Sequence, residues 1–149
     1  MIKIEIAEHI NQYEYNEKVI EWCQSSEFPY YDWVIIITFY SALHKIDCCL
    51  HQIGLTDRDI TSFRNEAKYG HQARNYEVML NFKEIKQDYI TLYTECRKLR
   101  YDQYKLNDIS KEDLESFINI WYNKIKPFSL SKRSNSSKEI KRRRYKRKI

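Results

Sequence analysis

The residues best suited to chemistry are arginines and histidines in the middle of the chain. Metal-free cleavage of RNA needs a base that deprotonates a 2′-hydroxyl group and cations that stabilise the charge developing on the phosphate. His71 and Arg74 are three residues apart, which places them on one face of a helix. His44, Arg97 and Arg100 join these catalytic candidates if their helices pack together. The alternative is that His44 is a hydrogen-bonded core histidine. Arg97 and Arg100 would then face solvent or pair with acids of their own helix.

Four polar residues that follow Pro29 would lie in one stripe along a helix. They are spaced by four, three and four residues: Tyr40, His44, Asp47 and His51. Histidine and aspartate are ligands that zinc accepts. The two histidines are two helical turns apart, however, so one ion could hardly contact both. The stripe therefore predicts a polar groove, and we expect no metal and no cofactor.

Tyrosines and arginines alternate along a later segment. Its members are Tyr89, Tyr93, Arg97, Arg100, Tyr101 and Tyr104. Aromatic rings can stack on bases while arginines hold phosphates. The pattern predicts a nucleic-acid-binding face that includes Tyr101 and Tyr104. The alternative is an amphipathic surface in which Tyr89 belongs to the core.

The strongest electrostatic signal lies at the C-terminus. Residues 132–148 contain ten Lys or Arg and one acid, whereas residues 1–131 contain 16 basic and 20 acidic residues. We predict that six of these cations contact nucleic acid: Lys141, Arg142, Arg143, Arg144, Lys146 and Arg147. Such a segment binds phosphates without regard to sequence and in a salt-sensitive way. We expect RNA in preference to DNA, the alternatives being an acidic protein partner or an aid to solubility.

The elements that must position these residues are predicted to be helices. A chain of 149 residues with two Gly and two Pro suits one domain and lacks the turn residues of a β fold. We predict an all-α, antiparallel four- to five-helix bundle over residues 1–128 and a disordered basic tail over residues 129–149. Apolar periodicity places the helices. They span about 4–23, 30–52, 71–82 and 84–105, and a fifth begins after Ser110 and ends before Pro127.

Three further features of the sequence indicate the cellular compartment. The four cysteines have no zinc-finger spacing, and the N-terminus does not resemble a signal peptide. The most apolar stretch, residues 33–43, is about half the length that a membrane span needs. We expect a cytoplasmic protein without a membrane segment.

Three segments, in this order and spacing, resemble the HEPN superfamily, the higher eukaryote and prokaryote nucleotide-binding domains. They are residues 32–54 (DWVIIITFYSALHKIDCCLHQIG), 70–80 (GHQARNYEVML) and 88–104 (DYITLYTECRKLRYDQY). The resemblance implies an antiparallel bundle that usually forms a homodimer. Many members are metal-independent endoribonucleases of toxin or defence systems, with an Arg followed after four to six residues by a His. Others lack that His and act as binding modules beside nucleotidyltransferases.

The sequence departs from the nuclease pattern at this motif. Arg97 and Arg100 are followed by Tyr101 and Asp102, and no His lies downstream. The segment resembles the Arg-x-x-Ala-Asp-Tyr variant of the binding members. Arg64 and His71, with six residues between them, satisfy the nuclease spacing literally, but Arg64 lies in a predicted loop and not on the expected helix. We expect an RNA-associated nucleic-acid- or nucleotide-binding module of a toxin or defence system. The alternatives are a metal-independent endoribonuclease and a structural helical partner protein.

Overall fold

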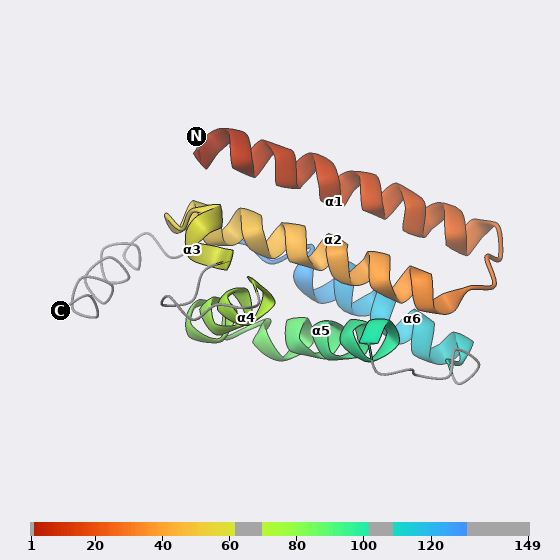
Figure 1. Cartoon of the computed structure of the whole chain (residues 1–149). Helices are drawn as coiled ribbons and strands as arrows, with labels where there is room; N and C mark the ends of the chain where they lie inside the picture. Colours follow the sequence, from red (N-terminus) through yellow and green to blue (C-terminus); the bar gives the residue numbers. More distant parts are fainter. Residues whose placement is uncertain (1, 62–69, 102–108, 131–149) are drawn as a thin grey trace.

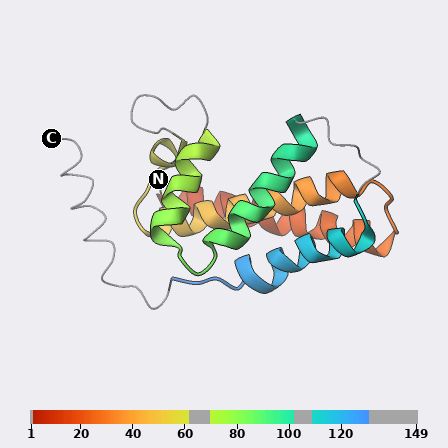
Figure 2. The ribbon, with the colours of Figure 1, turned by 90° about the horizontal axis from the view of Figure 1, so that it is seen from below.

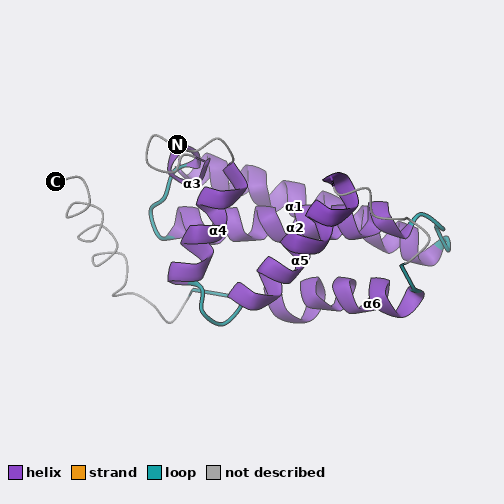
Figure 3. Cartoon of the chain, turned by 60° about the horizontal axis from the view of Figure 1, so that its bottom comes forward, coloured by secondary structure: helices purple, strands orange, loops and turns teal. Residues whose placement is uncertain are grey.

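The computed structural model describes residues 2–61, 70–101 and 109–130. Within these ranges every regular element is a helix, as Figure 3 shows, which confirms the predicted all-α bundle. The helices in chain order are α1 (Ile2–Ser25), α2 (Tyr31–Gln52), α3 (Asp57–Thr61), α4 (Gly70–Asn81), α5 (Lys86–Tyr101) and α6 (Lys111–Ile120). A π-helical turn, η2 (Trp121–Ile125), continues α6. The predicted boundaries hold to within two residues where the structure describes them.

Helix α2 is the centre of the bundle. It lies antiparallel beside α1 (Figure 1) and also packs against α3, α5, α6 and η2. Thirteen of its residues are buried, as a position at the centre of the bundle requires. Ile35, Ala42, Ile46 and Leu50 are fully inaccessible to solvent.

The remaining helices close the other side of α2. Figure 2 shows α4 and α5 crossing one face of the bundle and α6 running along another. The periodic apolar positions of α5 point inward, since Tyr89, Leu92 and Cys96 are buried. Trp121 and Ile125 of η2 fill the space between α2, α5 and α6.

The turn from α2 into α3 follows from one glycine. Gly54 has a positive φ of 93°, which glycine adopts without steric cost. The Gly54 N–H donates to His51 O and the Leu55 N–H donates to Leu50 O, the hydrogen-bond pair of a Schellman C-cap. Thr56 and Asp59 then cap the start of α3 reciprocally, through Thr56 N–H to Asp59 Oδ2 and Asp59 N–H to Thr56 Oγ1. The predicted end of this helix at residue 52 is therefore confirmed.

One described helix, α2, is long and apolar enough to cross a membrane by length and composition. The sequence prediction considered a shorter apolar stretch and missed this. Of the apolar 18-residue stretch of α2 that meets this test, however, 67% is buried inside the bundle, as expected for a core helix. A single helix of this kind is weak evidence for a membrane protein.

Candidate functional site

A cavity between α2, α4 and α5 brings together several predicted site residues. Its volume is about 450 Å³, within the range of small-ligand pockets. Its lining residues are Phe39, His71, Gln72, Tyr93, Cys96, Arg97, Arg100 and Tyr101. Two guanidinium groups, one imidazole and three aromatic rings therefore face one hollow.

The two cavity arginines are oriented by tyrosines. Arg97 donates from Nη1 to the hydroxyl oxygen of Tyr93 at 3.3 Å. Arg100 donates to the hydroxyl oxygen of Tyr40 on α2, and its guanidinium carbon lies 4.9 Å from the centre of the Tyr101 ring. An arginine side chain has five donors, more than one such bond uses. Both side chains can thus be held in place and still bind an anion.

His71 lies on the cavity wall between two aromatic rings. Its ring centroid is 5.9 Å from that of Phe39 and 5.8 Å from that of Tyr93. Burial lowers the pKa of His71, and the positive charges of Arg74 and Arg100 lower it further. Its buried Nδ1 has no hydrogen-bond partner among the described residues. The imidazole is therefore kept neutral near pH 7, the form that can accept a proton or a hydrogen bond.

Arg74 does not line the cavity. It forms a buried two-point ion pair with Asp47, with Nε 2.6 Å from Oδ1 and the second guanidinium nitrogen 3.0 Å from Oδ2. Arg74 is 7% exposed and Asp47 2%. The pair joins α4 to α2 and fixes the helix that carries His71 one turn earlier. Arg74 thus contributes position and electrostatic field, while two of its five donors are engaged by Asp47.

His44 also lies apart from the cavity. Its Nδ1 is 2.8 Å from Nδ1 of His9 on α1, a hydrogen bond between two imidazoles. Burial and the neighbouring His9 lower the pKa of His44. The members of the polar stripe on α2 contact different helices: Tyr40 bonds to Arg100, His44 to His9 and Asp47 to Arg74, while His51 contacts Leu55 and Asp57 and stacks on His9. The predicted groove is instead a buried seam that joins α2 to four other helices.

A larger hollow, of about 940 Å³, lies at the connection between α1 and α2 and along the start of α6. Its charged lining side chains are Glu27, Asp32, Lys111 and Glu115. Three acids against one base make this hollow unsuited to a phosphate. The smaller cavity, which holds two arginines and a histidine, is the better candidate site.

Of the catalytic candidates, the structure brings His71, Arg97 and Arg100 together, and it adds Tyr101. It separates Arg74 and His44 from them. Tyr104, Arg64 and the tail cations Lys141, Arg142, Arg143, Arg144, Lys146 and Arg147 lie outside the described residues. Sequence reasoning missed the roles of Phe39, Gln72 and His9, because each depends on contacts between helices. Asp47 was visible as a buried charge in an apolar helix, which signals a partner elsewhere in the chain.

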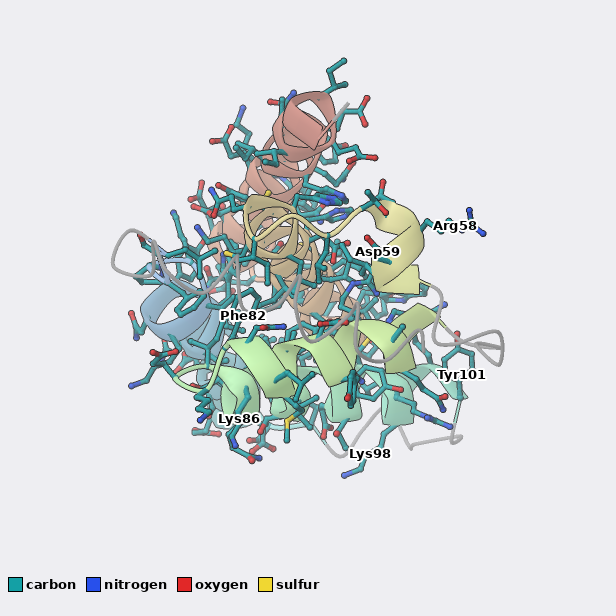
Figure 4. All side chains as sticks on the ribbon, turned by 90° about the vertical axis from the view of Figure 1, so that its left-hand side faces the viewer. Arg58, Asp59, Phe82, Lys86, Lys98 and Tyr101 are labelled. Carbon is teal, nitrogen blue, oxygen red and sulfur yellow. The ribbon has the colours of Figure 1, made fainter. Side chains whose placement is uncertain are left out.

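Lys98 lies on the same helix as Arg97 and Arg100 but does not line the cavity. Figure 4 shows Lys98, on α5, projecting away from the bundle, while Tyr101 lies at the end of the same helix. Lys98 pairs with Glu95 at 3.9 Å and is half-exposed. It is therefore a matched control for charge changes at Arg97 and Arg100.

No protein-family model matches the chain, and neither the curated proteins nor the solved structures include a significant match to it.

Proposed function

We propose that the chain is a HEPN-type module that binds the nucleotides of an RNA in the cavity between α2, α4 and α5. The observation that carries this proposal is the shared cavity of Arg97, Arg100, His71 and the rings of Tyr93 and Tyr101. Arginine provides several donors for phosphate oxygens, and tyrosine rings stack on bases at about 1–3 kcal/mol each. A phosphate would lie between the arginines and a base against a tyrosine.

The basic tail extends the same interaction in this proposal. Its cations would contact further phosphates and make the affinity strongly dependent on salt. The setting that we propose is cytoplasmic, within a toxin or defence system. The module would act as a homodimer, or beside a nucleotidyltransferase or another protein partner. RNA is favoured over DNA.

The test is fluorescence anisotropy of a 5′-fluorescein-labelled single-stranded RNA with the full-length chain. Arg97→Gln and Arg100→Gln should each weaken binding about tenfold or more, because each removes charge-assisted hydrogen bonds worth about 1.5–3 kcal/mol. Lys98→Gln, which removes the same charge from the outer face of α5, should change affinity by less than about twofold. Equal effects of all three substitutions would show that only overall charge matters and would contradict a cavity site.

Cleavage of the bound RNA is the second candidate function. It is favoured by one observation: His71 lines the same cavity as both arginines and has a lowered pKa. A neutral imidazole can take the proton of a 2′-hydroxyl group while the arginines stabilise the charge on the phosphate.

Cleavage is tested by incubating the full-length chain with labelled RNA in EDTA. Loss of cleavage in His71→Gln, with RNA binding retained, would establish His71 as the base. If the unaltered chain binds RNA without cleaving it, the result supports only the binding function. Failure to bind labelled RNA or ATP would point to the structural partner role.

A further inference from the structure

A second polar cluster joins α1, the end of α2 and the start of α3. It consists of His9, His51 and Asp57, and one nitrogen or oxygen atom of each lies within 4.8 Å of the others. Nε2 of His9 is 3.5 Å and Nε2 of His51 is 3.0 Å from the same oxygen, Asp57 Oδ1. The two imidazole rings stack with their centroids 5.2 Å apart. Three potential ligands from three helices thus converge on one small volume.

The spacing of these atoms matches that of ligands around one tetrahedral ion. Zinc lies about 2.0–2.1 Å from its nitrogen ligands and at a similar distance from carboxylate oxygens, so two tetrahedral ligands are about 3.3 Å apart. The two distances to Asp57 Oδ1, 3.0 Å and 3.5 Å, lie on either side of that value. Two of the three distances between ligands thus suit a tetrahedral ion, and the third is no longer than 4.8 Å.

His51 is held in the form that a metal requires. Its Nδ1 lies 2.6 Å from Leu55 O, and because a carbonyl can only accept, Nδ1 must donate. The lone pair of the neutral ring is then on Nε2. The residue is 1% exposed, and among the described residues its Nε2 makes no hydrogen bond, although Asp57 Oδ1 lies 3.0 Å away. A backbone carbonyl that orients the other ring nitrogen is typical of metal-binding histidines.

His9 is oriented in a similar way. Its Nδ1 bonds to Nδ1 of His44 and its Nε2 lies 3.5 Å from Asp57 Oδ1, to which it can donate. A metal on Nε2 would take the place of that proton, with the remaining ring proton on Nδ1 donated to His44. Glu5, one helical turn before His9, brings a second carboxylate close to the cluster. Its Oε2 is buried, lies 4.0 Å from Nδ1 of His51 and has no hydrogen-bond partner in the described part of the chain. Two carboxylates and two imidazoles form a ligand set that a divalent cation accepts.

The local fold explains how Asp57 reaches this position. The Gly54 turn brings Leu55 O over His51, and the reciprocal cap between Thr56 and Asp59 begins α3 at Asp57. In Figure 4, Arg58, the next residue, projects outward from α3. The sequence prediction of no metal rested on α2 alone, whose two histidines are too far apart. His9 from α1 supplies the ligand that one helix cannot.

We infer that His9, His51 and Asp57 bind one divalent ion of the zinc class and thereby clamp α1 to α2 and α3. The mixture of imidazole and carboxylate ligands suits zinc, and cobalt(II) can report on it. This inference is independent of RNA binding, because none of the three residues lines the cavity.

The test is a titration of the full-length, tag-free, chelator-treated chain with Co²⁺, followed by visible absorption. We expect one Co²⁺ per chain, the d–d bands of a tetrahedral site without a near-ultraviolet thiolate band, and displacement by Zn²⁺. His9→Gln and Asp57→Asn should each weaken Co²⁺ binding by about tenfold or more, as losses around metal sites do. The matched control is His71→Gln, which changes the chain's remaining histidine outside the cluster and its contacts. It should leave binding unchanged.

His9→Gln and Asp57→Asn change partly exposed side chains, and circular dichroism would establish that the two variant chains remain helical. Three results would overturn the inference. The first is no stoichiometric Co²⁺ or Zn²⁺ binding by the unaltered chain. The second is a thiolate-to-cobalt band, which would assign the ion to cysteines. The third is unchanged affinity in helical His9→Gln and Asp57→Asn chains.

Discussion

Asp47 of α2 and Arg74 of α4 form a buried ion pair with two parallel contacts, 2.6 Å and 3.0 Å long. This pair connects the central helix to the helix that carries His71. Burial alone would lower the pKa of Arg74, but the adjacent carboxylate of Asp47 raises it above its ordinary value. The guanidinium is therefore charged at every physiological pH.

Removing one partner of this pair should be costly. Asp47→Ala leaves the Arg74 charge buried without its carboxylate, and we expect a loss of about 3–5 kcal/mol in the free energy of unfolding. Urea unfolding followed by circular dichroism measures the change. The double variant Asp47→Leu with Arg74→Met removes both charges and should recover much of the loss. A double variant no more stable than Asp47→Ala would contradict this account.

The hydrogen bond between Arg100 and Tyr40 should matter for binding more than for folding. Tyr40→Phe removes the hydroxyl acceptor but keeps the ring beside the guanidinium. We expect RNA affinity to fall about threefold to tenfold, because the lost bond orients Arg100 without contacting the RNA, and a typical intramolecular hydrogen bond contributes about 0.5–1.5 kcal/mol. Tyr15→Phe, at an exposed tyrosine of α1, is the control and should have no effect. An unchanged affinity in Tyr40→Phe would show that Arg100 needs no such support.

The lowered pKa of His71 predicts a pH dependence. The described groups that set it are Arg74 on α4, Arg100 on α5 and Asp47 on α2, besides burial. Because the folded state binds the proton less readily than the unfolded state, neutral His71 contributes stability above its ordinary pKa of 6.5. That contribution is lost as the pH falls from 6.5 through the lowered folded value.

NMR titration of the His71 ring measures this directly. We expect a midpoint below 6.5, and Arg100→Gln should move the midpoint upward because it removes a positive charge. Lys98→Gln should leave it nearly unchanged. A midpoint at or above 6.5 would contradict the described burial of the ring.

The start of α6 offers a test of the fold. The Ser110 hydroxyl oxygen accepts from the Asp113 N–H at 3.0 Å, and Asp113 Oδ2 accepts from the Ser110 N–H at 3.2 Å. Ser110→Ala should lower the free energy of unfolding by about 1 kcal/mol, whereas Ser110→Asp keeps a capping oxygen and should restore most of it. Thermal or urea unfolding of the two variants distinguishes these outcomes.

Local signals account for most of what the sequence predicted about the fold. The cap at Ser110, the turn at Gly54 and the apolar periodicity of α5 each depend on neighbouring residues, so one sequence suffices to read them. The burial of Tyr89, Leu92 and Cys96 follows from that periodicity. The π-helical turn at Trp121–Ile125 was not predicted, because its extra residue per turn leaves no distinct pattern in a short apolar segment.

The candidate site was predictable only in part. Arg97, Arg100 and Tyr101 share one helix and were singled out by their spacing, as was His71 with Arg74. Their meeting with Phe39 depends on how α2, α4 and α5 cross, which spacing along one helix does not determine. His9 and His51 are 42 residues apart, so their stacking was beyond any local pattern.

The most direct test of the central claim is to locate the RNA on the protein. A single-stranded RNA containing 4-thiouridine would be crosslinked to the full-length chain by ultraviolet light, and the crosslinked peptides identified by mass spectrometry. The account predicts crosslinks within α5, at Tyr93 or Tyr101, that disappear in Arg100→Gln while those in residues 132–148 persist. Crosslinks confined to residues 132–148 in the unaltered chain would contradict a binding role for the cavity.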